Sequence, residues 1–322
     1  MATPVEILPR TFARLEEGEE FSVLQWNNLA DGLLDSFVKI PQDALQWSHR
    51  VKITQAEYLR WNADIVFAEE VNHPDLVRST LEPLGFACFH MPKPNSVATT
   101  FGYPPDGVML CYRKSKFTSL FHEPRRENLC NTNQVALLDV LVPVSHPDRR
   151  VIVAVTHLKA GHNPEFEELR LRQAAFLLQK IDHLAGEIAG DDAAAASKIS
   201  AILGGDMNAV PTVESIQTLL RANSLSRLSA HGLVNTYAQA EQAGAYHPEA
   251  GTHWTTWKYR ESSGMVKRCI DYLMYTPATS GGGLRLCAVS PPPLAADVGP
   301  DGLPSMKAAS DHIPICATFK FC

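Results

Sequence analysis

Polar side chains of the kinds that do chemistry recur at the ends of apolar stretches in this chain. The clearest case is LGGDMN, residues 203–208, where Asp206 and Asn208 stand two residues apart after an apolar run. Alternate residues of an extended chain point the same way, so both side chains would face one site if extension continues through the glycines. A carboxylate can align an attacking water, and an amide can hold a phosphoryl oxygen.

Other apolar runs end or begin with residues of the same kinds, namely Asn27, Glu70, His157, Asp271, Asp311 and His312. Taken singly, most of them have a structural alternative, such as a strand-end cap, turn chemistry or a hydrogen-bonded core side chain. Glu70 resists that interpretation, because it follows an apolar run beside Glu69 and its burial would require a partner or a metal. Their occurrence together favours one site on irregular segments held by a sheet.

These residue types together suit metal-assisted chemistry at a phosphoryl group. A lone hard carboxylate with amide and water ligands suits Mg²⁺, with Mn²⁺ as the alternative ion, and the chain has no Cys/His ligand spacing for zinc. Two histidines with carboxylates suit proton transfer and charge neutralisation around a phosphate. We therefore expect an aspartate-oriented water to attack a metal-polarised phosphoryl group.

Short β-rich runs alternating with helices must position these residues. Strands are expected over 21–26, 64–71, 107–113, 134–144, 151–158, 198–206, 269–275 and 315–321. One helix is expected over roughly 43–61, and a second from Asn163-Pro164, where a cap residue and a proline precede acidic residues. Residues 185–200 suggest a helix tail and a flexible connection, and 280–284 and 291–293 suggest surface turns. The pattern predicts a mixed α/β (α+β) class.

Length and composition set the outer limits. The 322 residues suit an N-terminal arm over 1–20 and one domain over 21–322. A net charge of −6 disfavours a protein that tracks a long polyanion and favours a compact anionic substrate in a local basic pocket. Seven dispersed cysteines without a C-x-x-C indicate a reducing compartment. No membrane span is expected, and we expect a cytoplasmic monomer, or a mitochondrial one if a natural N-terminus was trimmed.

Seven short motifs, in chain order, resemble the exonuclease-endonuclease-phosphatase superfamily. They are WNNLA (26–30), EEV (69–71), DGV (106–108), THL (156–158), GDMN (205–208), IDYL (270–273) and SDH (310–312). The resemblance implies a four-layer sandwich, in which two mixed sheets lie face to face with helices outside, and Mg²⁺-dependent phosphoester hydrolysis at one end.

The resemblance also implies a role for each matched residue. Glu70 is the implied metal ligand, with Asn27 and Asp311 near the metal. Asp206 and Asn208 take the water and phosphate roles given above. The remaining implied roles are phosphate contact for His157 and, for Asp271, orientation of His312.

Further motifs resemble the nocturnin-like proteins of that superfamily. They are PQDALQWSHR (41–50), MPKPNS (91–96), TNQVA (132–136), THLKA (156–160), TTWKYR (255–260) and LPSMKAASDH (303–312). This resemblance implies removal of the 2′-phosphate from NADP⁺ and NADPH, giving NAD⁺ or NADH and phosphate. The substrate contacts that follow from the matched motifs are Lys93, Lys159, Asn133 and Asp106.

Two departures from these motifs concern substrate binding. Gly161 stands where nocturnin-like proteins have an arginine, and Arg170 is a candidate replacement for that phosphate contact. Glu69 stands where the superfamily usually has glutamine, and it would add negative charge beside the metal if it faces inward.

Two other functions compete with the dinucleotide phosphatase. A 3′-to-5′ poly(A) exoribonuclease would need stacking platforms and a basic track, for which Trp254, Trp257, Lys258 and Arg260 are candidates. A non-enzymatic scaffold is disfavoured, because a decayed site would have lost at least one residue of a set that is intact here: Asn27, Glu70, His157, Asp206, Asn208, Asp271 and His312.

Overall fold

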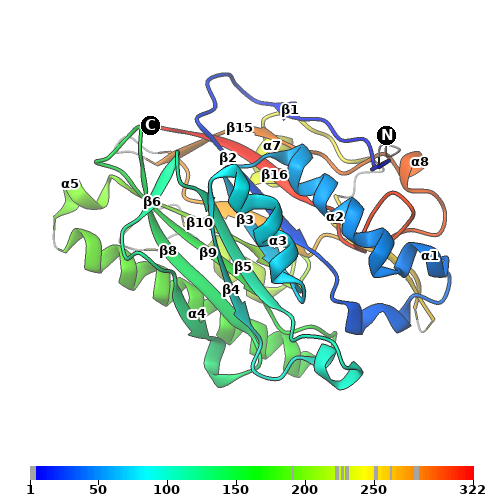
Figure 1. Cartoon of the computed structure of the whole chain (residues 1–322). Coiled ribbons are helices and arrows are strands. Elements are labelled where there is room, and N and C mark those ends of the chain that lie inside the picture. The colour runs from blue at the N-terminus through cyan, green and yellow to red at the C-terminus, as the bar shows by residue number, and fades with distance from the viewer. Residues whose placement is uncertain are drawn as a thin grey trace.

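The computed structural model describes residues 5–190, 192–221, 225, 228, 232–249, 253–261, 263–278 and 283–322. Residue 191 of the expected connection and residues 280–282 of the expected turn lie outside these ranges. Two β-sheets lie face to face, with helices on both outer sides (Figure 1). The predicted four-layer sandwich of mixed sheets is confirmed.

The first sheet has the strand order β1-β15-β16-β2-β3-β5-β4. Its strands are β1 (Ala13–Arg14), β2 (Phe21–Asn27), β3 (Ile65–Glu69), β4 (Phe86–Pro92), β5 (Gly107–Arg113), β15 (Leu284–Val289) and β16 (Ile315–Phe321). The central strands β2 and β3 run parallel, while β16 and β5 run antiparallel to them. Strand β1, from the expected N-terminal arm, pairs with β15.

The second sheet has the order β11-β14-β10-β9-β8-β6, and β7 also pairs with β8. Its strands are β6 (Phe117–Ser119), β7 (Arg125–Asn128), β8 (Val135–Pro143), β9 (Arg150–His157), β10 (Ile199–Asp206), β11 (Val234–Asn235) and β14 (Asp271–Tyr275). Strands β9 and β10 run parallel, and β14 runs antiparallel to β10. A separate hairpin joins β12 (Thr256–Arg260) to β13 (Gly264–Arg268).

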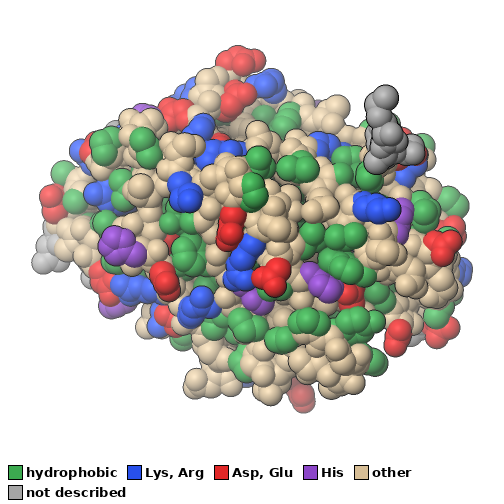
Figure 2. Space-filling view, viewed as in Figure 1, with side chains coloured by type: hydrophobic (Ala, Val, Ile, Leu, Met, Phe, Trp, Pro, Cys, Tyr) green, Lys and Arg blue, Asp and Glu red, His purple; other side chains and the backbone are tan. Residues whose placement is uncertain are grey.

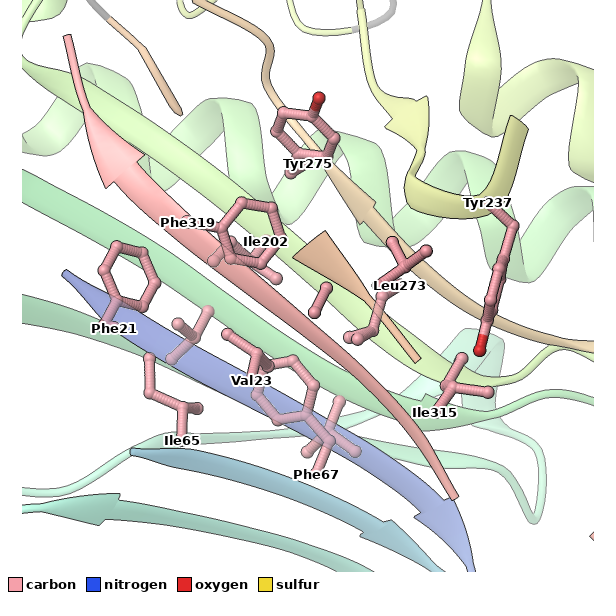
Figure 3. Close-up of a cluster of buried hydrophobic side chains, with 14 of the residues drawn as sticks. Phe21, Val23, Ile65, Phe67, Ile202, Tyr237, Leu273, Tyr275, Ile315 and Phe319 are labelled. Atoms are coloured by element: carbon pink, nitrogen blue, oxygen red, sulfur yellow. The ribbon is translucent and has the colours of Figure 1, made fainter. Parts of the chain in front are cut away.

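Alternate apolar side chains of the two sheets meet in a central core. Val23 and Phe67 from the first sheet face Ile202 and Leu273 from the second (Figure 3). Replacing a fully buried phenylalanine such as Phe67 with alanine would cost ~3–5 kcal/mol. The same period-two alternation continues to the strand ends, where polar residues take the place of apolar ones.

Helices cover the outer faces of both sheets. Helices α2 (Trp47–Trp61) and α3 (Pro74–Leu81) pack on the first sheet, and α4 (Pro164–Ala189) and α6 (Glu214–Leu220) pack on the second. The remaining helical segments are η1 (Asp31–Ser36), α1 (Gln42–Leu45), η2 (Glu82–Leu84), η3 (Val97–Phe101), η4 (Leu129–Asn131), α5 (Ala193–Ala196), α7 (Thr236–Gln242) and α8 (Ala295–Val298). Within the described ranges, no helix is long and apolar enough to cross a membrane.

All eight predicted strands are present, but the first predicted helix is broken. Gln46 adopts an extended conformation, with ψ 133°, and separates α1 from α2. The second predicted helix begins at Pro164 with Asn163 as its N-cap. The strands that were not predicted are β1, β4, β6, β7, β11, β12, β13 and β15. Several of them have only two to four residues, and β4 is half-buried along most of its length and lacks a clear alternation.

Candidate active site

Chain direction brings the polar strand ends to one edge of the sandwich. The parallel pairs β2–β3 and β9–β10 end there, at Asn27, Glu69, His157 and Asp206. Strand β14 runs the other way and begins there, so that Asp271 lies directly opposite Asp206. All of these residues border, or lie beneath, a cavity of about 510 Å³ whose lining includes Glu70, Asp206 and His312.

Glu70 is held in place from both sides. Asn27 Nδ2 donates to Glu70 Oε1 at 3.0 Å, and the Ala30 amide donates to Glu70 Oε2 at 3.0 Å. Glu70 has a φ of +53° and Leu29 a φ of +61°, a left-handed conformation that non-glycine residues rarely adopt. Such backbone strain clusters at functional sites, where the surrounding structure enforces it.

Asp206 and Asn208 face the same cavity, but through a turn rather than through continued extension. The strand ends at Asp206, Asn208 has a φ of +50°, and its backbone amide donates to Asp206 Oδ1 at 2.9 Å. A Cβ on Gly205 would lie 2.0 Å from the Thr156 carbonyl oxygen, so glycine is required just before this aspartate. Burial, followed by the nearby Asp271 carboxylate, raises the pKa of Asp206 to about 7.

His157 lies between Lys93 and Asn208. Asn208 Nδ2 donates to His157 Nε2 at 2.9 Å and to the Leu158 carbonyl at 3.1 Å. Burial and then the Lys93 ammonium hold the pKa of His157 well below its usual value, so the ring is neutral. A neutral imidazole has one acceptor nitrogen, and the shorter contact assigns that role to Nε2. Nδ1 then carries the proton, so Lys93 Nζ, 3.4 Å from Nδ1, makes no hydrogen bond to the ring.

Asp271 and His312 form a buried pair beside Asp206. His312 Nδ1 lies 2.8 Å from Asp271 Oδ2, and Thr255 Oγ1 donates to the same oxygen at 2.6 Å. Burial would lower the pKa of His312, but the carboxylates of Asp271, Asp311 and Asp206 raise it to about 10. The imidazolium Nε2 lies 3.8 Å from Asp206 Oδ2 and 3.7 Å from Asp311 Oδ2. The protonated ring is therefore a cation in the lining of the cavity.

Asp311 pairs with Lys258 of β12, and Arg260 Nη2 lies 3.9 Å from the same carboxylate. Burial would raise the pKa of Asp311, but Lys258 and His312 lower it to about 2. Asp311 is therefore ionised, and its ion pair with Lys258 holds the hairpin β12–β13 beside the cavity.

Glu69 faces inward, beneath the site, and not toward the cavity. Gln25 Nε2 donates to Glu69 Oε2 at 2.7 Å and to Asp271 Oδ1 at 3.3 Å, and no described residue bonds Glu69 Oε1. Burial, then Asp271 and Asp206, raise the pKa of Glu69 well above its usual value. Burial therefore disfavours the charged form of this carboxyl, and the side chain lies outside the cavity lining.

The donor set of the site fits a divalent cation. Ligand atoms of Glu70, His157 and Asp206 lie within 4.8 Å of one another, and so do those of Asp206, Asp271 and His312. Glu70 and Asp206 are buried carboxylates, as a hard cation prefers. Asn27 adjoins both carboxylates, but its Oδ1 accepts the Leu29 amide, and Asp311 is engaged by Lys258.

Four of the residues expected to contact substrate line the cavity, and they differ in the partners they already have. Lys93 and Asp106 both line the cavity and form an ion pair of 2.6 Å. Asn133 also lines it and joins the Asn95 backbone through two hydrogen bonds of 2.8 Å. Lys159 lines the cavity with Nζ 4.3 Å above the Phe166 ring. Within the described part of the chain, no carboxylate forms an ion pair with Lys159.

Arg170 lies outside the cavity lining and supports a loop instead. Its guanidinium pairs with Glu167 at 2.8 Å and donates to the carbonyls of Lys159 and Gly161, each at 2.8 Å. Arg170 was expected to replace the missing arginine as a phosphate contact, but its guanidinium is bonded within the protein. A second arginine, Arg268 of β13, contacts the loop that holds Gly161: its Nη1 lies 2.7 Å from His162 Nε2.

The tryptophans considered for RNA stacking pack against each other, with ring centroids 5.4 Å apart, and neither lines the cavity. Lys258 and Arg260 of the same hairpin do line it.

Three positioning residues were not anticipated from the sequence. Gln25 and Thr255 hold Asp271, while Arg50 pairs with Asp31 at 2.6 Å and donates to the carbonyls of the loop before Ala30. A buried arginine in a helix gives no sequence signal of its partners. Arg50 is the last residue of the PQDALQWSHR motif at 41–50, and the motif alone assigned it no role.

The arrangement can hydrolyse a phosphoester. A bound divalent ion would polarise the phosphoryl oxygens. Asp206, with both oxygens oriented by Asn27 and Asn208, can hold the attacking water and take its proton. The imidazolium of His312 and the Asn208 amide can stabilise negative charge on the phosphoryl oxygens.

Comparisons with known proteins agree with this geometry. The Endonuclease/Exonuclease/phosphatase family model matches residues 24–312. Nocturnin of Xenopus laevis is 29% identical over 97% of this chain and 75% of its own length, and human Nocturnin is 31% identical over 93% and 65%. The chain thus spans about two thirds of the mammalian relative.

Solved structures show the same fold. The human Nocturnin catalytic domain with a bound sulfate anion aligns over 97% of both chains, with a TM-score of 0.73 and 26% identity. ANGEL2, a 2′,3′-cyclic phosphatase, aligns over 97% of this chain with a TM-score of 0.74 at 22% identity, which supports the fold alone. The chain belongs to the Endonuclease/Exonuclease/phosphatase family of phosphoesterases, as a nocturnin-like member.

Proposed function

We propose that the protein is a Mg²⁺-dependent phosphatase that removes the 2′-phosphate of NADP⁺ and NADPH. The observation that carries the proposal is a bounded cavity of about 510 Å³ with the hydrolytic residues at its floor. Such a volume suits a compact ligand. The donor set of carboxylates and an amide supports Mg²⁺ as the ion, with Mn²⁺ as the alternative.

The cations around this cavity support an anionic substrate with more than one charge. Lys93 and Lys258 are each paired with a carboxylate, whereas Lys159 is 4.3 Å from an aromatic ring and has no such partner among the described residues. A second anionic group, such as the diphosphate of a dinucleotide, would give Lys159 its partner. The nocturnin-like motifs support the same substrate class, and the sulfate bound by human Nocturnin is an analogue of phosphate.

A short poly(A) is the second candidate substrate, and one experiment separates the two. Phosphate release is measured from NADPH and NADP⁺, and nucleotide release from a short oligoadenylate, with Mg²⁺ and with Asp206→Ala as the blank. We expect phosphate from both dinucleotides, NAD⁺ or NADH as the other product, and intact RNA. Nucleotide release from RNA without phosphate release from the dinucleotides would overturn the proposal and leave the family assignment standing.

A further inference from the structure

An apolar surface at the mouth of the cavity has no role in the hydrolysis described above. Leu33 of η1 and Val97 and Phe101 of η3 all line the cavity, yet they are 36%, 53% and 53% exposed. Large apolar side chains rarely stay exposed side by side unless they meet a ligand or a partner. Val38 and Tyr103, just beyond the two short helices, are also exposed and line a second cavity.

The two short helices form one continuous wall, because they approach each other very closely. A Cβ on Gly32 would lie 2.5 Å from the Ala98 Cα, so only glycine allows this contact. Ser96 caps η3, accepts the Ala98 amide and donates to the buried Asp106 carboxylate, which is paired with Lys93. The wall is therefore fixed to the same residues that border the catalytic floor.

The cavity lining combines apolar and cationic side chains. Lys159, Lys258 and Arg260 line it together with the apolar residues. Figure 2 shows hydrophobic side chains beside polar ones in the lower right of the molecule, where Figure 1 draws the blue helical turn that precedes α1. A ligand that fills this space needs an anionic part for the cations and a flat apolar part for the wall.

We propose that Leu33, Val97 and Phe101 bind a planar heterocyclic ring of the nucleotide substrate, with the Phe101 ring as the stacking surface. This inference rests on the proposed function and adds to it the part of the site that recognises the base. Aromatic stacking tolerates any planar ring, because every base has a π-face. The wall would orient the nucleotide so that its phosphate reaches Asp206 and Asn208, without itself touching the reacting atoms.

The test measures ring binding apart from hydrolysis. NAD⁺, which carries both rings and lacks the 2′-phosphate, is titrated calorimetrically into the Mg²⁺-loaded wild type and Phe101→Ala, and inorganic phosphate is titrated as the ring-free probe. We expect Phe101→Ala to weaken NAD⁺ binding about tenfold, the loss typical of one stacking contact, and to leave phosphate binding unchanged. Phe101→Trp should retain NAD⁺ affinity within about twofold.

Phe12 is the matched control. It is 41% exposed and stacks edge-on against Trp61, 5.7 Å away, outside the cavity lining. Phe12→Ala should leave both affinities unchanged. Equal NAD⁺ affinity in the wild type and Phe101→Ala, or an equal loss of NAD⁺ and phosphate affinity, would overturn the inference. Failure of the proposed function has a different signature, since the wild type would then release no phosphate from NADP⁺ or NADPH while the ring-binding comparison keeps its outcome.

Discussion

The Asp271 carboxylate holds His312 Nδ1 at 2.8 Å, and this contact directs the other ring nitrogen toward Asp206 and Asp311. The pair lies at the start of β14 and just before β16, strands of different sheets. A contact across the two sheets therefore fixes both the orientation and the charge of a ring at the cavity floor.

Replacing Asp271 with asparagine should lower kcat by about 10²-fold or more, with a smaller effect on KM. The amide removes the negative partner of His312, so the ring loses the charge that would stabilise the phosphoryl oxygens. Steady-state kinetics across pH checks this. The same substitution at Asp139, a buried carboxylate of β8 outside the cavity lining, should leave kcat within about twofold. Equal loss in both variants would indicate a folding defect instead.

The pKa of His312 also predicts how stability depends on pH. Its folded value is about 10, above the ordinary 6.5, so the folded state binds the proton more tightly than the unfolded state. The resulting stabilisation is complete below about pH 6.5 and is lost as the pH rises toward 10; its full size is on the order of 5 kcal/mol. Urea unfolding of the wild type should show this decline, and His312→Gln should show a flatter curve between pH 7 and 10. Parallel curves would contradict the assignment.

Glu69 and Glu70 are adjacent carboxyls with opposite expected behaviour. Glu70→Gln should raise the Mg²⁺ concentration for half-maximal activity by about tenfold or more, because a hard cation loses a carboxylate ligand. Glu69→Gln should change that concentration less than threefold, since Glu69 lies outside the cavity lining, accepts from Gln25 and has its charged form disfavoured by burial. Metal titration of activity in both variants measures the difference. Equal shifts would mean that Glu69 contributes to metal binding as much as Glu70, contrary to its position beneath the site.

Much of the site could be predicted because its residues interrupt apolar runs. Asn27, His157 and Asp206 continue the inward-facing positions of β2, β9 and β10. Apolar residues such as Val23, Val155 and Ile202 occupy earlier positions on the same faces, so the change to polar residues is informative. The strands themselves were predictable for the same reason, as buried period-two segments with clear ends.

The rest depended on contacts between segments far apart in the chain. Gln25 and Thr255 differ in no sequence feature from ordinary strand and loop residues, and only the sheet register places them beside Asp271. Arg170 was a plausible phosphate ligand because nothing in a sequence tells a free arginine from one already bonded to Glu167 and two carbonyls. Phe101 was not considered, since a single aromatic residue in a loop gives no sign of the cavity it faces.

Lys159 should be the cavity lysine whose loss most affects substrate affinity. Lys93 and Lys258 already have carboxylate partners, whereas Lys159 does not within the described residues. Lys159→Ala should raise KM for NADP⁺ and NADPH by about one to two decades, the size of a lost charge-assisted contact, with little change in kcat.

Lys180 is the matched control, because its Nζ also lies over a phenylalanine, Phe176 at 5.0 Å, while pairing with Glu127 outside the cavity. Lys180→Ala should leave KM unchanged, and the salt dependence of KM should weaken only in Lys159→Ala. An unchanged KM in Lys159→Ala would show that the substrate's second charge is bound elsewhere, which would direct attention to Arg260 on the opposite hairpin.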